Sequence, residues 1–238
     1  MDITSTNIET SRDDKYRIYA QKYPVVITVI LLIVVLSLAE YSLWLHLNWT
    51  IRILSILSST GIVVAFSFLC ARIIRRIAKD TLEKPFIFKP KRKPTTRLLI
   101  KSDTHITDAL KQSVVCKLKE EEQWQLESTK VRDWNSKSYV EAVEASTSYI
   151  KDQTRLDSIL FDRNCYYGFA RNLYGGLFFN MLIIMGMLLT LLAMHNENWM
   201  LYGYMLIIVL VLMFFAALMA YREGLEYAER LYEAYTNK

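Results

Sequence analysis

The sequence lacks any recognisable arrangement of catalytic residues. It contains no GxSxG nucleophile motif, no Walker-type phosphate loop and no HExxH metal-binding motif, and no pair of carboxylates has a convincing partner. Its three histidines, His46, His105 and His195, are too far apart in the sequence to indicate a shared metal site. We therefore expect a protein that is not an enzyme, with no catalytic residues, no metal and no cofactor.

Cysteine is scarce and shows no functional spacing. Cys70, Cys116 and Cys165 are the only cysteines, and no two of them form a CxxC pair. This spacing is typical of neither a zinc site nor a redox pair, so we interpret them as ordinary residues.

Charge is nearly absent from four long apolar runs, which are residues 24–47, 53–71, 177–194 and 199–221. A bilayer core needs roughly 20 helical residues, and only helices satisfy their own backbone polar groups in lipid. Four such runs in one short chain argue against buried helices of a soluble protein. The sequence therefore predicts an all-α integral membrane protein with four transmembrane helices in two hairpins.

Basic residues are missing from the two short connections between these runs. Of the 29 Lys and Arg residues, all but Arg52 lie before the first run, between the second and third, or after the fourth. Because basic residues collect on the cytoplasmic face, both termini and the middle region are expected in the cytoplasm.

The chain is expected to have five parts. They are a cytoplasmic N-terminal segment (1–23), a first transmembrane hairpin (24–77), a mostly helical cytoplasmic insert (78–172), a second hairpin (173–221) and a helical cytoplasmic tail (222–238). The insert is too small and too poor in apolar residues for a conventional enzyme domain.

Helical spacing of apolar residues organises the cytoplasmic parts. One helix is expected to begin after Ser102 or Asp103, a second is centred near Val143, and a third begins near Asp157 and runs into the third span. The apolar faces are Ile106, Leu110, Val114 and Leu118, then Tyr139, Val143, Ser146 and Ile150, and in the tail Leu225, Ala228, Leu231 and Tyr235. Residues 96–100 are expected to form a short strand. The helix that follows the second span is expected to end near Glu83, because Pro85 disfavours helix before it.

Two charged residues lie at the predicted outer membrane boundary. Glu40 is the only acid inside a predicted span, and Arg52 stands at the start of the second span. Charges inside a membrane are functional candidates, so both are candidates for a pore mouth. An ion pair within the hairpin, or side chains that reach to water, is the alternative.

A basic linker follows the second span. Its candidate ligand-binding cations are Lys89, Lys91, Arg92, Lys93, Arg97 and Lys101. Such a cluster beside a span is typical of binding to anionic lipid. With aromatic residues nearby, here Phe86 and Phe88, it is also typical of binding to nucleic acid.

Two stripes share the segment before the third span. Arg163, Tyr167 and Arg171 recur every four residues, as do Asn164, Gly168, Asn172 and Gly176. Small residues permit close helix contact, whereas tyrosine and arginine anchor a helix at the membrane surface. Gly175 and Gly176 also lower helix stability. We interpret the segment as a mechanical joint between the cytoplasmic part and the spans, and direct contact with a ligand is the alternative.

The motifs "PTTRLLIKSD" (94–103) and "YYGFARNLYGG" (166–176), together with the two hairpins, resemble a group of bacterial four-span proteins. These are the antiphage defence effectors encoded beside a nucleotidyltransferase, as in Hailong-type systems. The resemblance covers the chain from Arg72 onwards. The residues that it carries over are Thr95, Thr96, Arg97, Ser102 and Asp103 in the first motif, and Tyr167, Gly168, Arg171, Asn172, Gly175 and Gly176 in the second.

The resemblance implies a homo-oligomeric channel, for instance a tetramer, in the bacterial inner membrane. It also implies control by a nucleotide or a short single-stranded DNA oligomer that the partner enzyme makes, with channel opening arresting the infected cell. Two other classes stay open. One is a membrane-anchored scaffold that docks a soluble defence protein, and the other is a small transporter.

Overall fold

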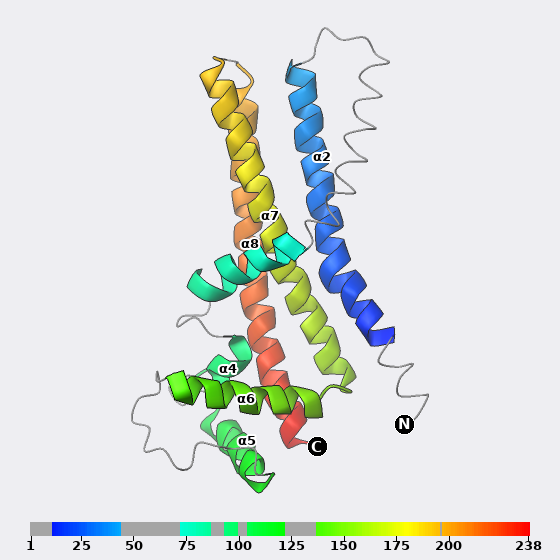
Figure 1. Cartoon of the computed structure of the whole chain (residues 1–238), viewed down its shortest axis with the longest axis vertical. Helices are drawn as coiled ribbons and strands as arrows, with labels where there is room; N and C mark the ends of the chain where they lie inside the picture. The colour runs from blue at the N-terminus through cyan, green and yellow to red at the C-terminus, as the bar shows by residue number, and fades with distance from the viewer. Residues whose placement is uncertain (1–10, 44–71, 87–92, 100–103, 122–136, 196) are drawn as a thin grey trace. The chain divides into compact units, whose positions relative to one another are not determined.

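All regular elements that the structure describes are helices (Figure 1). The computed structural model describes residues 11–43, 72–86, 93–99, 104–121, 137–195 and 197–238. Within these ranges three helices are long and apolar enough to cross a membrane, namely Ser11–Val35, Ser158–Ala193 and Trp199–Thr236. The all-α prediction is therefore confirmed for the described residues, and the run 53–71 lies outside them.

The first helix begins well before its apolar run. Residues 11–16 are α-helical, the π-helix η1 follows over Arg17–Lys22, and α2 covers Tyr23–Leu43. Another helix begins at Arg72 and becomes the π-helix η2 over Lys79–Phe86. The remaining helices are α4 (Pro94–Leu99), α5 (Asp108–Glu120), α6 (Lys137–Gln153), α7 (Ser158–Ala193) and α8 (Trp199–Thr236).

The chain divides into two compact units. Unit 1 comprises Met1–Leu82 and Gly168–Met219, and unit 2 comprises Glu83–Tyr167 and Ala220–Lys238. The helices α7 and α8 contribute to both units, because each continues without a break past the limits of its apolar run.

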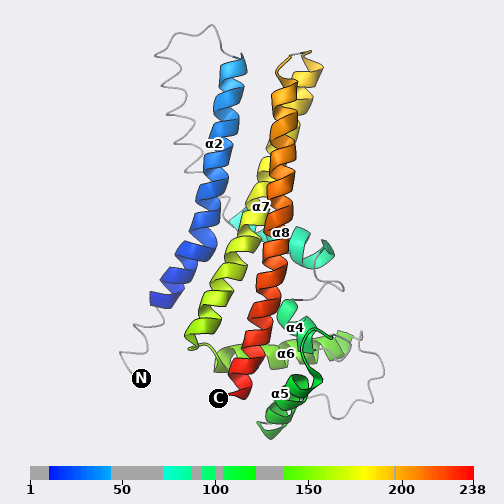
Figure 2. The ribbon, with the colours of Figure 1, turned by 180° about the vertical axis from the view of Figure 1, so that it is seen from behind.

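The core of unit 2 surrounds the C-terminal turns of α8. The helix α6 lies across this part of α8 (Figures 1 and 2). The buried residues include the predicted apolar faces, which are Ile106, Val114 and Leu118, then Tyr139, Val143 and Ile150, and in α8 Leu225, Ala228, Leu231 and Tyr235. These faces are confirmed, because every third or fourth residue of a helix points to the same side.

Two tyrosines of α8 attach neighbouring helices to this core. The hydroxyl of Tyr232 donates to the carbonyl oxygen of Thr95 in α4, and that of Tyr235 donates to Oε2 of Glu121 at 2.5 Å. Lys117 Nζ donates to the carbonyl oxygen of Tyr235 at 2.8 Å. Burial raises the pKa of Tyr232, and burial followed by the contact with Glu121 raises the pKa of Tyr235. Both hydroxyls therefore remain protonated donors at neutral pH.

Three local predictions need correction. Residues Pro94–Leu99 form the helix α4, whereas a strand was expected from residue 96. Proline is well suited to the first position of a helix, and the helix buries Leu98 and Leu99 in the core. The helix α5 is capped by Thr107, whose hydroxyl accepts from the backbone N–H of Leu110, so its cap is neither Ser102 nor Asp103. The helix that the structure describes from Arg72 continues beyond Glu83 to Phe86, and it is π-helical from Lys79 onwards.

Candidate functional site

The candidate site is the set of contacts that residues 168–180 of α7 make in unit 1. One side of this segment packs against the first helix, residues 11–43, and another side packs against the helix that begins at Arg72. We call this set of contacts the α7 junction. Val25 and Ile74 form its small apolar core, with Val29 and Phe179 packed against them.

A proline determines the first polar contact of the junction. Pro24 has no N–H, so it cannot donate to the carbonyl oxygen of Ala20, its partner four residues earlier in an α-helix. The π-helical turn η1 ends two residues before this proline, and the N–H of Tyr23 donates to the carbonyl oxygen of Ile18, five residues back. Asn172 Nδ2 of α7 donates to the carbonyl oxygen of Ala20 at 2.6 Å. The asparagine thus supplies the hydrogen bond that Pro24 cannot make.

A second asparagine repeats this contact two helical turns further on. Asn180 is fully buried, and its Nδ2 donates to the carbonyl oxygen of Thr28 at 3.0 Å. Both acceptors lie eight residues apart on the first helix, and both asparagines lie eight residues apart on α7. The two helices are therefore parallel along this contact and share one register. Polar side chains that bond across helices hold such pairs together where water is excluded.

Two glycines of the small-residue stripe allow the parallel helices to come close. A Cβ atom at Gly168 would lie 2.9 Å from the Cβ of Ala20 and equally near the hydroxyl of Tyr16. A Cβ atom at Gly176 would overlap the side chain of Thr28. The stripe of Gly168, Asn172 and Gly176 is thus the surface that α7 turns towards the first helix.

Gly175 makes the same kind of contact with a different helix. A Cβ atom at this position would lie 2.5 Å from the carbonyl oxygen of Ile74 and 2.8 Å from the Cβ of Ala78. The adjacent Gly175 and Gly176 therefore allow two different helices to pack closely against two sides of α7. Both glycines lie inside the continuous helix α7.

In the stripe of arginines and tyrosine, Tyr167 and Arg171 are buried, whereas the side chain of Arg163 is 36% exposed. In unit 2, Arg163 Nη1 pairs with Glu226 at 2.6 Å and with Glu223 at 3.5 Å, both on α8. Tyr167 is buried, with its ring against Gly224 of α8. In unit 1, Arg171 is only 6% exposed. Arg163 and Tyr167 therefore contact α8, and the expected anchoring at the membrane surface stays a prediction.

The predicted ligand-binding residues are only partly described. Lys93 is exposed and Arg97 is half-buried, whereas Thr95 and Thr96 are buried in unit 2. The two threonine side chains are therefore part of the packing of α4. Lys89, Lys91, Arg92, Lys101, Ser102 and Asp103 lie outside the described residues. Of the two pore-mouth candidates, Glu40 lies in α2 and Arg52 lies outside the described residues.

Several residues of the junction were not predicted from the sequence. On the first helix, the residues at the contact with α7 are Tyr16, Ala20, Pro24 and Thr28. On the helix described from Arg72, Ala78 packs against Gly175. Pro24 could have predicted one of these contacts, because a proline inside a helix leaves the carbonyl oxygen four residues earlier without its usual N–H donor.

Comparisons of the chain with protein-family models, with curated proteins and with solved structures found no match.

The close contact at Gly175 predicts opposite effects for two Gly→Ala substitutions. Gly175→Ala should destabilise the protein by about 1–3 kcal/mol, because the new methyl group meets the backbone of Ile74. Gly186→Ala is the matched control in the same helix, since nothing lies within 4 Å of its Cβ position. It should be neutral or stabilise by up to about 1 kcal/mol, because alanine favours helix. Thermal unfolding in detergent measures both, and equal stability of the two variants would contradict the contact.

The role of Asn172 can be measured by a double-mutant cycle with Pro24. Asn172→Ala should destabilise by about 1–3 kcal/mol, the effect of leaving a buried carbonyl without its donor. The loss should be smaller in a Pro24→Ala background, where residue 24 has an N–H that can donate to Ala20. Asn180→Ala is the control, because its acceptor on Thr28 does not depend on residue 24. A coupling to Pro24 that is equal for both asparagines would show this assignment to be wrong.

Proposed function

We propose that this protein is an oligomeric membrane channel that is gated through its cytoplasmic part. The observation that carries the proposal is the continuity of α7 and α8. One end of each helix belongs to the packed core of unit 2, and the other end is a candidate membrane span. A ligand that binds two states of unit 2 with different affinity shifts the balance between them. Because α7 and α8 connect unit 2 covalently to the spans, such a shift can reach the spans.

The proposed topology is four transmembrane helices in two hairpins, in the bacterial inner membrane, with the termini and the insert in the cytoplasm. The parallel contact between the first helix and α7 supports it, because the first helix of each hairpin then enters from the same side. The distribution of Lys and Arg along the sequence supports the orientation.

The proposed conduit forms between subunits around a symmetry axis. Within its apolar run, α8 buries a single row of side chains, which are Tyr202, Val209, Ala216 and Ala220. The described residues leave most of its surface uncovered, so that lipid or other copies of the chain can contact it. Closed rings are the usual form of such assemblies, and a tetramer is one of them.

The proposed biological role is that of an effector in antiphage defence by abortive infection. It rests on the resemblance described above, which implies gating by a nucleotide or a short DNA oligomer from a nucleotidyltransferase. The members of the basic linker that the structure describes are the exposed Lys93 and the half-buried Arg97. The buried Thr95 and Thr96 act through the packing of α4 rather than by contact with the ligand.

The second candidate is a membrane-anchored scaffold that docks a soluble defence protein without forming a pore. The compact core of unit 2 favours it, because a packed helical unit can present a docking surface whether or not the spans conduct.

Ion flux separates the two candidates. Purified full-length protein in liposomes should release a trapped ion, and added single-stranded DNA oligomers should change the rate. Liposomes that remain impermeable both with and without the oligomers would favour the scaffold. The variant Gly186→Ala, which leaves the α7 junction intact, is the control for the quality of reconstitution.

Binding of DNA to the basic linker should depend strongly on salt. Phosphate contacts release counterions, so the affinity for a short single-stranded oligomer should fall steeply between low and physiological salt. Substituting glutamine for all three of Lys91, Arg92 and Lys93 should weaken binding and reduce the dependence of the affinity on salt, as measured by fluorescence anisotropy. No binding at low salt, or binding unchanged by the substitutions, would exclude the linker as a DNA site.

A further inference from the structure

The helix that begins at Arg72 has one packed side and one basic side. Ile74 and Ala78 pack against Gly175 of α7. Arg72, Arg75 and Lys79 are spaced at i, i+3 and i+7, which places them on one stripe beside the packed side. The helix therefore holds three cations along the edge of the α7 junction.

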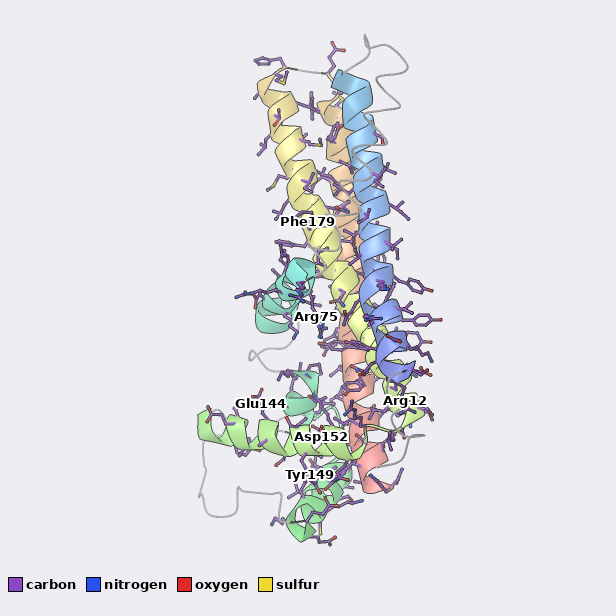
Figure 3. The ribbon with its side chains drawn as sticks, turned by 45° about the vertical axis from the view of Figure 1, so that its right-hand side comes forward. Arg12, Arg75, Glu144, Tyr149, Asp152 and Phe179 are labelled. Carbon is purple, nitrogen blue, oxygen red and sulfur yellow. The ribbon has the colours of Figure 1, made fainter. Side chains whose placement is uncertain are left out.

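Arg75 differs from its neighbours because it is partly enclosed by the protein. Its Nε atom is buried and has no hydrogen-bond partner among the described residues, whereas the side chain of Arg76 is 87% exposed. Figure 3 labels Arg75 on this helix and Phe179 on α7. A guanidinium is always charged, and a buried donor without an acceptor is unfavourable. The protein therefore encloses Nε and orients the side chain, and only the remaining, accessible part of the half-buried Arg75 can meet an external oxygen acceptor.

The chemistry of that acceptor is that of a phosphate group. The planar guanidinium donates two parallel hydrogen bonds to a phosphate, and flanking cations add to the attraction. Arg76 lies beside the carboxylate of Asp80, at 3.9 Å. Arg72 and Lys79, one turn on either side of Arg75, are both exposed.

The position of the stripe favours a lipid as the source of the phosphate. Arg72 directly follows the apolar run 53–71 in the sequence. Basic residues next to a span attract anionic headgroups of the inner leaflet. We propose that Arg75, flanked by Arg72 and Lys79, binds the phosphate of an anionic phospholipid at the edge of the α7 junction.

This site is independent of the proposed channel activity, because its occupation is measured without ion flux. The full-length protein in neutral detergent is titrated with phosphatidylglycerol, and the rise of its thermal unfolding midpoint reports binding. Phosphatidylcholine, inorganic phosphate and a short DNA oligomer are titrated in parallel. Arg75→Gln removes the enclosed guanidinium, and Arg76→Gln removes the same charge one residue away. Arg75→Lys keeps the positive charge but replaces the planar guanidinium with an ammonium group. It is the test variant if Arg75→Gln does not fold.

The expected result is that phosphatidylglycerol stabilises the wild-type protein and Arg76→Gln alike. Arg75→Gln should bind it about tenfold more weakly, which is the effect of one charged hydrogen bond, and Arg75→Lys should fall between. Equal weakening by Arg75→Gln and Arg76→Gln would mean diffuse electrostatic attraction and would overturn the proposal. Stabilisation by inorganic phosphate or the DNA oligomer through Arg75, without an effect of phosphatidylglycerol, would overturn the assignment to lipid.

Discussion

The α7 junction depends on one constraint, which is that a backbone carbonyl away from water needs a hydrogen-bond donor. Pro24 removes such a donor at the entry to the first apolar run, and Asn172 replaces it from α7. This bond, with its counterpart from Asn180 to Thr28, sets the register between two parallel helices. Glycines at 168 and 176 are then required, because the side chains of Tyr16, Ala20 and Thr28 occupy the space that a Cβ atom would need.

A fixed register has consequences for how motion can pass along α7. A shift of α7 by one helical turn would place asparagine side chains where the first helix leaves room only for glycine. Sliding of α7 along the first helix is therefore disfavoured, and the two helices are expected to move together as one body. The same helix contributes Arg163 and Tyr167 to unit 2, where they contact α8. These contacts are the physical basis of the proposed coupling.

The sequence was sufficient to predict helices and apolar faces, because buried positions such as Val114, Leu118 and Val143 repeat with the helical period. The glycine stripe also indicated a close contact. Its partner was not predictable from local pattern, because Ala20 is 152 residues from Asn172. The error at residues 96–100 has a similar cause, since a short apolar run is compatible with strand or helix until its tertiary contacts are known. The burial of Arg171 also depends on neighbours that spacing alone does not reveal.

The register of the α7 junction is tested most directly by cysteine cross-linking of the full-length protein in membranes, with Cys70, Cys116 and Cys165 replaced by serine. Cysteines at positions 28 and 180 should form a disulfide, because Asn180 Nδ2 lies 3.0 Å from the carbonyl oxygen of Thr28 and all the glycines of the junction are kept. Cysteines at 28 and 188 should not, since two helical turns add about 12 Å. Cross-linking of 28 with 188 in preference to 180, or of neither pair, would contradict the account.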